Sequence, residues 1–190
     1  MKKVGKRDWI EEGFKALTDS GPQALTIEAL CVRLGVTKGS FYHHFRNRQD
    51  YIKELLKDWQ QETTVQIINA SQSETNTGKE IDTLLRLVFT IPPERDLAVR
   101  ALALYEPEAR IFQEDIDRNR RTYLEKINNA FVDGAEESRL MAIIDYAWYL
   151  GIRLMFPPLD EDDKEKMIAL YKKIKQSYLN QYRGKKDDNR

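Results

Sequence analysis

Near the start of this 190-residue chain, one glycine and two further residues separate two predicted helices. The first helix carries a buried stripe of Ile27, Leu30 and Leu34. Gly35 supplies the left-handed backbone that ends a helix, and after Val36 the next residue, Thr37, is a capping residue for a helix over 38–44. Such a short link is typical of a helix-turn-helix unit, in which an earlier helix packs underneath. The sequence therefore predicts a three-helix unit at the N-terminus.

The earlier helix is predicted over 7–19, and Ser20-Gly21-Pro22 ends it because glycine caps and proline forbids continuation. Thr26 is the predicted N-cap of the second helix. A unit of this size needs apolar residues from each helix. The candidates for its core are Ile10, Phe14, Leu17, Leu25, Ile27, Leu30, Leu34, Val36, Phe41 and Phe45.

Helical patterns also dominate the rest of the chain, and strand patterns are nearly absent. Asn47 and Asp50 form a capping-box-like start for a fourth helix, and the polar segment 71–78 is a predicted loop. Later helices are predicted around 81–88, 94–106, 108–132, 136–156 and 161–182, with stops at Pro92-Pro93, Pro107 and Pro157-Pro158. We expect an all-α fold of about nine helices. Its predicted parts are a three-helix domain over 1–48, a helical domain over 49–183, and a disordered charged tail over 184–190.

Charge is distributed unevenly, although the formal net charge is zero. Residues 1–48 hold nine Lys or Arg against five Asp or Glu, which leaves +4 there and −4 over the remainder. A local positive field of this kind favours phosphate binding. The single cysteine, Cys31, excludes an internal disulfide and is expected to be a buried hydrophobe. Without a signal peptide or a membrane-length apolar run, a cytoplasmic protein is expected.

The third helix and its surroundings combine small polar, planar and basic side chains, a mixture that suits contact with a DNA groove. Lys38 and His43 could reach base edges, and Gly39 lets the backbone approach closely. His44 has two readings, a packing residue or a phosphate contact. The basic residues Lys2, Lys3, Lys6 and Arg7 likewise either solubilise the chain or add DNA contacts. The candidate DNA-binding residues from this reasoning are Thr26, Thr37, Lys38, Gly39, Ser40, Tyr42, His43 and His44.

Residues 7–59 resemble the DNA-binding domain of the TetR family of bacterial repressors. The resemblance lies in Ala24-Leu25-Thr26-Ile27, in the run from Leu34 to Phe45, and in Arg46-Asn47-Arg48-Gln49-Asp50. It implies an all-α homodimer that acts as a repressor and has a variable effector domain. It also implies that Tyr42 and Arg48 contact phosphates, which adds Arg48 to the candidate DNA-binding residues.

The middle helices offer aromatic and polar residues of the kind that line an effector pocket, although ordinary core is the alternative reading. The candidates for ligand binding are Phe89, Tyr105, Phe112, Asn119, Tyr123 and Trp148. The last two helices carry apolar stripes in which Ala147 and Gly151 permit close approach, so we expect them to pair with a second copy. No catalytic triad, phosphate loop or metalloprotease motif is present, so we expect no enzyme, no cofactor and no metal. The expected function is a ligand-responsive repressor that binds a palindromic operator as a homodimer. The alternative is a regulator controlled by a protein partner or lacking an effector.

Overall fold

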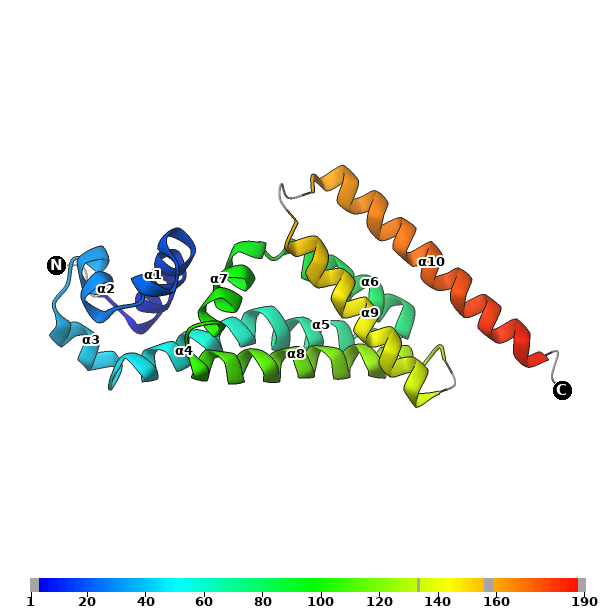
Figure 1. The fold of residues 1–190 in the computed structure, drawn as a ribbon, viewed down its shortest axis with the longest axis horizontal. Helices are drawn as coiled ribbons and strands as arrows, with labels where there is room; N and C mark the ends of the chain where they lie inside the picture. Colours follow the sequence, from blue (N-terminus) through cyan, green and yellow to red (C-terminus); the bar gives the residue numbers. More distant parts are fainter. Residues whose placement is uncertain (1–3, 133, 156–158, 188–190) are drawn as a thin grey trace. The chain divides into compact units, whose positions relative to one another are not determined.

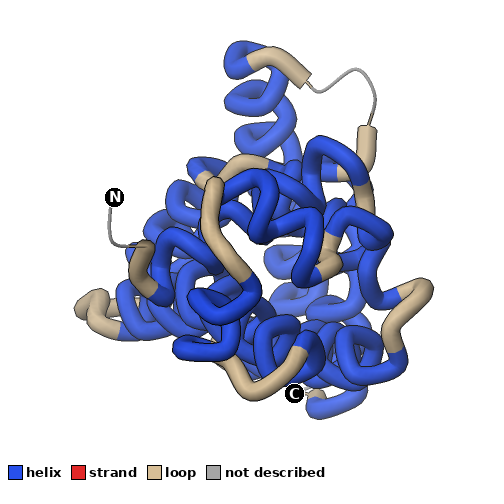
Figure 2. Tube along the Cα trace, turned by 90° about the vertical axis from the view of Figure 1, so that its left-hand side faces the viewer, coloured by secondary structure: helices blue, strands red, loops and turns tan. Residues whose placement is uncertain are grey.

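The computed structural model describes residues 4–132, 134–155 and 159–187. Within these ranges every regular element is helical, and loops join the helices without a strand (Figure 2). Counted as continuous helices of more than one turn, the described ranges hold nine, which confirms the predicted all-α fold. None of these helices combines the length and the apolar character that crossing a membrane requires. The chain divides into two compact units, Met1–Asn119 and Arg120–Arg190.

The first unit begins with α1 (Lys6–Ser20), the 3₁₀ turn η1 (Pro22–Ala24), α2 (Ile27–Leu34) and α3 (Lys38–His44) (Figure 1). The two predicted glycine stops have the expected backbone: Gly21 has φ 78° and Gly35 has φ 66° and ψ 36°. Both angles lie in the region that side chains with a Cβ rarely adopt. The helix-turn-helix geometry predicted from Gly35 is confirmed.

Four aromatic rings form the centre of this unit. Trp9 packs edge-on against Phe41, with ring centroids 5.3 Å apart, and Phe45 packs edge-on against Tyr51 at 5.0 Å. The Tyr51 hydroxyl donates a hydrogen bond of 2.9 Å to the carbonyl of Trp9, so its polar end is satisfied inside the core. Burying each ring contributes about 1.5–3 kcal/mol. Of the ten predicted core residues, seven are buried and three, Ile27, Leu34 and Val36, are half-buried.

The fourth helix is long and changes pitch in its middle. It runs as α4 (Arg48–Gln60), the π-helical segment η2 (Gln61–Val65) and α5 (Gln66–Gln72). The predicted start is confirmed, because Asn47 Oδ1 accepts from the backbone N–H of Asp50 at 2.8 Å and Asp50 Oδ2 accepts from that of Arg46 at 3.0 Å. The π-helical turn was not predicted. π-Bulges recur at functional sites because they cost stability.

The rest of the first unit contains α6 (Thr77–Thr90), α7 (Pro93–Ala103) and the beginning of α8 (Pro107–Asn128). Because α5 ends at Gln72, the predicted loop 71–78 shrinks to four residues between it and α6. Helix α7 packs beside α1, with Val99 and Leu102 fully buried. It also contacts α4, since the Trp59 indole N–H donates to the buried Asp96 carboxylate at 3.0 Å. Helix α4 therefore shares its core with both α1 and α7, and the predicted domain border at 48/49 stays a prediction.

The second unit contains the end of α8, α9 (Ala135–Arg153) and α10 (Glu161–Asp187). Its buried residues include apolar ones, such as Ile127 and Tyr146, and a polar group around Asp145. The Asp145 carboxylate accepts from Asn128 at 2.9 Å, from Lys175 at 2.6 Å, and from the Tyr171 hydroxyl. The Tyr171 ring stacks on Trp148, with centroids 4.0 Å apart.

One predicted boundary in the second unit differs from the structure, and another lies outside the described residues. Helix α10 continues to Asp187, so residues 184–187, predicted as part of a disordered tail, are helical, and residues 188–190 lie outside the described residues. Helix α9 ends at Arg153, and the predicted stop at Pro157-Pro158 also lies outside the described residues.

Candidate nucleic-acid interface

Helix α3 separates its apolar residues from its polar ones. Phe41 and Phe45, at its middle and C-cap, are buried against Trp9. The intervening side chains point the other way, and Tyr42 is 56% exposed. The predicted DNA-facing residues are therefore accessible: Thr37, Lys38, Gly39, Tyr42 and His43 are exposed, and Ser40 is half-buried. The buried rings of Phe41 and Phe45 hold α3 in place, and its polar side chains stay accessible.

Helix α2 precedes α3 in the motif, and the capping hydrogen bond at its N-terminus is formed. The Thr26 hydroxyl oxygen accepts a hydrogen bond of 3.1 Å from the backbone N–H of Ala29. Accepting uses a lone pair of the hydroxyl and not its O–H, which is the donor that a phosphate oxygen needs. Thr37 begins α3 with extended backbone, but its side chain makes no capping hydrogen bond. Its hydroxyl is thus not engaged as the predicted cap.

An ion pair joins the two helices of the motif. The Lys38 ammonium at the start of α3 donates to the carboxylate of Glu28 on α2, and both side chains are more than half exposed. This hydrogen bond lowers the pKa of Glu28 and raises that of Lys38, so both groups stay charged around neutrality. Surface pairs of this kind are worth little, so Lys38 can exchange Glu28 for a base or a phosphate at small cost.

Two of the predicted DNA contacts have partners within the protein. His44 is half-buried, and its Nε2 lies 3.1 Å from the carbonyl oxygen of Val4, which matches the packing alternative for this residue. Arg48 donates from Nε to the carbonyl oxygen of Leu25 at 2.6 Å and pairs through Nη2 with Glu106 at 2.8 Å. These contacts could not be predicted from the sequence, because the partners are far away along the chain.

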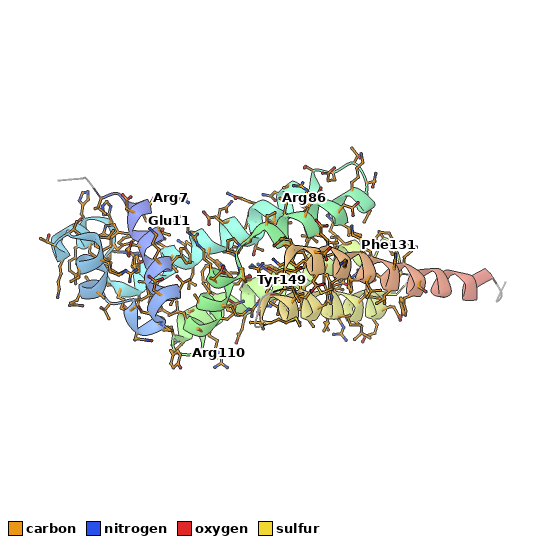
Figure 3. The ribbon with its side chains drawn as sticks, turned by 90° about the horizontal axis from the view of Figure 1, so that it is seen from above. Arg7, Glu11, Arg86, Arg110, Phe131 and Tyr149 are labelled. Atoms are coloured by element: carbon orange, nitrogen blue, oxygen red, sulfur yellow. The ribbon has the colours of Figure 1, made fainter. Side chains whose placement is uncertain are left out.

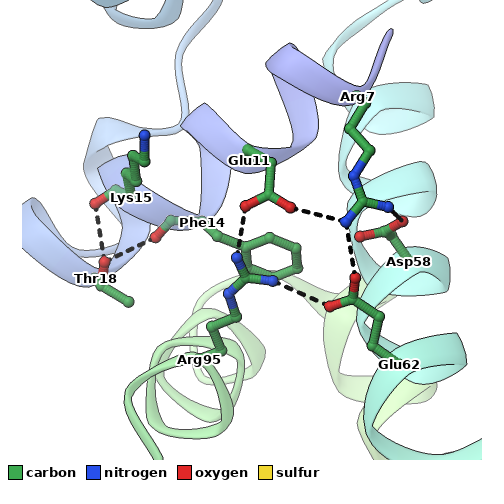
Figure 4. Close-up of polar contacts among 8 residues, drawn as sticks. All are labelled: Arg7, Glu11, Phe14, Lys15, Thr18, Asp58, Glu62 and Arg95. Carbon is green, nitrogen blue, oxygen red and sulfur yellow. Dashed lines mark hydrogen bonds and ion pairs between the residues drawn. The ribbon is translucent and has the colours of Figure 1, made fainter. Parts of the chain in front are cut away.

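Sequence reasoning also missed an ion network that ties the motif to the helices behind it (Figure 4). Arg7 and Glu11 lie one turn apart on α1 (Figure 3), and Arg7 Nη2 contacts Glu11 at 3.1 Å and Glu62 of η2 at 3.0 Å. Arg95 of α7 completes the ring, with Glu11 at 2.6 Å and Glu62 at 3.1 Å. Nearby, burial and then the charge of Glu62 raise the pKa of Asp58.

Two of the basic N-terminal residues, Lys6 and Arg7, have structural roles. Arg7 is engaged in the network, and Lys6 pairs with Glu54 at 2.7 Å while lying 5.7 Å from the centre of the Phe45 ring. Lys6 therefore connects α1 to α4 and to the C-cap of α3, and Arg7 connects α1 to η2. Neither of the two alternatives included this role. Lys2 and Lys3 lie outside the described residues.

The candidate ligand-binding residues differ in exposure. In the first unit, Phe89 and Phe112 are half-buried, Asn119 is exposed and Tyr105 is 74% exposed. In the second unit, Tyr123 is buried and Trp148 is half-buried against Tyr171. Asn119 contacts Asp115 at 3.3 Å on the surface of α8. Their role in binding stays a prediction.

Comparison with known proteins shows what this chain is similar to. Residues 10–55 match the family model described as bacterial regulatory proteins, tetR family. The HTH-type transcriptional repressor KstR2 of Rhodococcus jostii (strain RHA1) is 26% identical over 130 residues, which cover 68% of this chain. The match spans 61% of that protein's length.

Two solved structures share the fold over most of both chains. The fatty acid degradation regulator FadR from Bacillus halodurans has a TM-score of 0.63 at 16% identity, covering 80% of this chain and 84% of that one. A transcriptional regulator of the TetR/AcrR family from Aquifex aeolicus VF5 has a TM-score of 0.61 at 20% identity, covering 89% and 98%. The sequence match covers the helix-turn-helix motif, and the structural matches extend the likeness to the helices behind it. Over residues 10–55 this chain therefore matches the DNA-binding region of the tetR family of bacterial regulatory proteins, and as a whole it is similar to regulators of that family.

Proposed function

We propose that this protein is a repressor that binds a palindromic operator as a homodimer and releases it when a small molecule binds. The observation that carries the proposal is helix α3. Its exposed polar face, with Tyr42 outermost, is backed by the buried rings of Phe41 and Phe45. A rigid, polar and partly basic helix of this kind fits the major groove. The curated relative KstR2 is itself described as a repressor.

The dimer is supported by an apolar face that the second unit leaves uncovered. Ile144 on α9 and Ile174 on α10 are 56% and 59% exposed. The other large exposed apolar residues in these helices and in the two residues after α9 are Leu140, Ile143, Leu154, Met155, Leu170 and Tyr178. Gly151, one turn from Ala147, is exposed, and a Cβ built on it would meet nothing within 4 Å. Exposed apolar surface on this scale marks a protein interface, and two copies of two helices form a four-helix bundle.

In a homodimer, two α3 helices would read two half-sites about 34–36 Å apart on one face of the duplex. An effector would act by favouring a state in which this spacing no longer matches the DNA. The candidate residues of the second unit, Tyr123 and Trp148, are aromatic, so the effector would have an apolar part that packs against them.

DNA binding is tested with an operator selected from random duplexes and with DNA from upstream of the gene. We expect sequence-specific binding whose affinity falls steeply as salt rises from about 50 to 200 mM. Ser40→Ala and His43→Ala should weaken binding without changing thermal stability. Binding that ignores both sequence and salt would overturn the proposal.

Dimerisation is tested by light scattering of Ile144→Asp and Ile174→Asp, which should yield monomers. Leu104→Asp is the matched control, because Leu104 is equally apolar and 80% exposed but lies in the first unit. A wild-type monomer at micromolar concentration would contradict the dimer.

The effector step is tested by measuring operator release with a panel of amphipathic small molecules on wild type, Tyr123→Ala and Trp148→Ala. We expect the two variants to bind the operator normally and to respond less. If no small molecule releases wild type, the regulator answers to a protein partner or to no effector.

A further inference from the structure

Arg48, the first residue of α4, holds together three segments of the first unit. Its Nε donates to the carbonyl oxygen of Leu25 at 2.6 Å, and its Nη2 pairs with Glu106 Oε1 at 2.8 Å. Each of the two charged side chains keeps 29% of its surface exposed. The guanidinium therefore lies at the edge of the protein, within reach of solvent and of a ligand.

The position of this guanidinium is suited to a phosphate. Leu25 immediately precedes Thr26, the N-cap of α2, so Arg48 lies beside the positive end of that helix. A helix N-terminus next to an arginine favours an oxygen anion. In this structure the anion is supplied by the protein itself, since the Glu106 carboxylate takes the place next to Arg48.

We propose that Glu106 competes with DNA for Arg48, so that operator binding requires the guanidinium to exchange an internal carboxylate for a backbone phosphate. This inference rests on the proposed DNA-binding function and adds to it a residue outside the DNA-binding motif. Both anions accept charge-assisted hydrogen bonds from arginine, so the exchange conserves the charge pairing of Arg48. Glu106 thereby lowers affinity for every DNA sequence rather than changing which sequence is read.

The backbone hydrogen bonds of Glu106 couple the position of its carboxylate to α7 and α8. The N–H of Glu106 donates to the carbonyl oxygen of Leu102 in α7 at 3.0 Å, and its own carbonyl oxygen accepts from Arg110 in α8 at 3.0 Å. Glu106 is thus fixed to the end of one helix and the start of the next. A shift of α7 against α8 would move its carboxylate relative to Arg48 and change how readily Arg48 reaches DNA.

The experiment is a double-mutant cycle in the full chain with Glu106→Gln, Arg48→Gln and the double variant. Each is titrated with operator duplex and with a duplex of unrelated sequence between about 50 and 200 mM salt. Glutamine at 106 keeps the size of the side chain and removes its charge. Glutamine at 48 can still donate to Leu25. Both variants should therefore fold, which circular dichroism verifies.

We expect Glu106→Gln to tighten binding to both duplexes roughly two- to fivefold, because an exposed ion pair no longer has to break. The slope of log affinity against log salt should stay nearly unchanged, because wild type makes the same phosphate contact once Glu106 is displaced, whereas Arg48→Gln should flatten it by about 0.9. In the Arg48→Gln background the same change at 106 should leave the affinity unchanged. That difference is what a purely structural role of Glu106 would not produce.

Glu114→Gln is the matched control, since it removes the same charge from an exposed α8 residue that pairs with Arg110 and not with Arg48. The proposal is overturned if Glu106→Gln weakens binding, or if its effect persists without Arg48 or is matched by Glu114→Gln. If none of these proteins, wild type included, binds DNA in a salt-dependent way, the proposed function fails and the exchange fails with it.

Discussion

The helix-turn-helix motif and the second unit bury different mixtures of residues. In the motif the centre is aromatic, with Trp9 and Phe41 fully buried, and the polar residues of α3 face outward. In the second unit the centre holds the Asp145 carboxylate and its donors, while Ile144 and Ile174 are more than half exposed.

This difference has a physical consequence for folding and assembly. An aromatic core gains its stability from burial within one chain, so the motif can hold α3 in place by itself. The second unit buries charged and polar groups beside its apolar residues and leaves Ile144 and Ile174 exposed, so it would gain further stability if a second copy covered that face. The first arrangement suits a rigid reading element, and the second suits an assembly surface.

The sharpest test of the aromatic side of this comparison is a pair of neighbouring substitutions. Phe41→Ala should destabilise the protein by about 3–5 kcal/mol, because it empties the space against Trp9. Tyr42→Ala should change stability by less than about 0.5 kcal/mol, because the side chain is exposed. Urea unfolding followed by circular dichroism measures both.

DNA titration of the same pair separates anchoring from contact. Tyr42→Ala should weaken operator binding and leave the salt dependence unchanged, because the tyrosine hydroxyl is uncharged and neutralises no phosphate. An equal loss of stability in both variants would show that the two faces of α3 are not distinct.

The polar side of the comparison is tested at Asp145. Asp145→Ala leaves Lys175 and Tyr171 without their common acceptor. We expect a loss of about 2–3 kcal/mol, less than for a fully buried pair because Lys175 keeps some access to water. Lys173→Ala on the exposed side of α10 is the control and should be neutral in thermal unfolding. An unchanged melting temperature in Asp145→Ala would mean that the polar centre contributes no stability.

A third prediction concerns how tightly the aromatic core is packed. A Cβ on Gly13 would lie 1.8 Å from Tyr51 Oη and 2.6 Å from Leu55 Cδ1, so Gly13→Ala should cost about 1–3 kcal/mol. Gly39→Ala is the matched control, because there the nearest atom is Thr37 Oγ1 at an ordinary 3.6 Å. It should keep or slightly raise stability, since alanine favours a helix. If the clash with Tyr51 is the cause, Gly13→Ala should cost less in a Tyr51→Phe background.

The features that could be predicted from the sequence are those with local causes. Gly35 ends α2 whatever lies around it, and Asn47 begins α4 with a hydrogen bond that spans three residues. For the same reason the exposed face of α3 followed from the spacing of Phe41 and Phe45.

The features that could not be predicted depend on residues far apart in the chain. Glu11 meets Arg95 across 84 positions, and Arg48 meets Glu106 across the length of four helices. The burial of Trp9 likewise depends on α3 and not on the pattern within α1. The sequence pattern of a helix does not indicate such pairs, because a charged residue fits the same position whether water or another helix faces it.

The smallest predicted effect concerns the contribution of a charged side chain to the stability of the motif, whose core is apolar. The Asp50 carboxylate accepts the backbone N–H of Arg46 at 3.0 Å, and this hydrogen bond lowers the pKa of Asp50 in the folded protein. The folded pKa then lies below the unfolded value of about 3.9, so the contribution is complete above that value and is lost as pH falls through the folded pKa. Asp50→Asn should therefore lower the melting temperature by a constant amount from about pH 5 to 8, and the difference should vanish at lower pH. Because the main cause is a hydrogen bond, about 1 M salt should leave the difference in place, whereas its loss would assign the effect to the charge of Arg46.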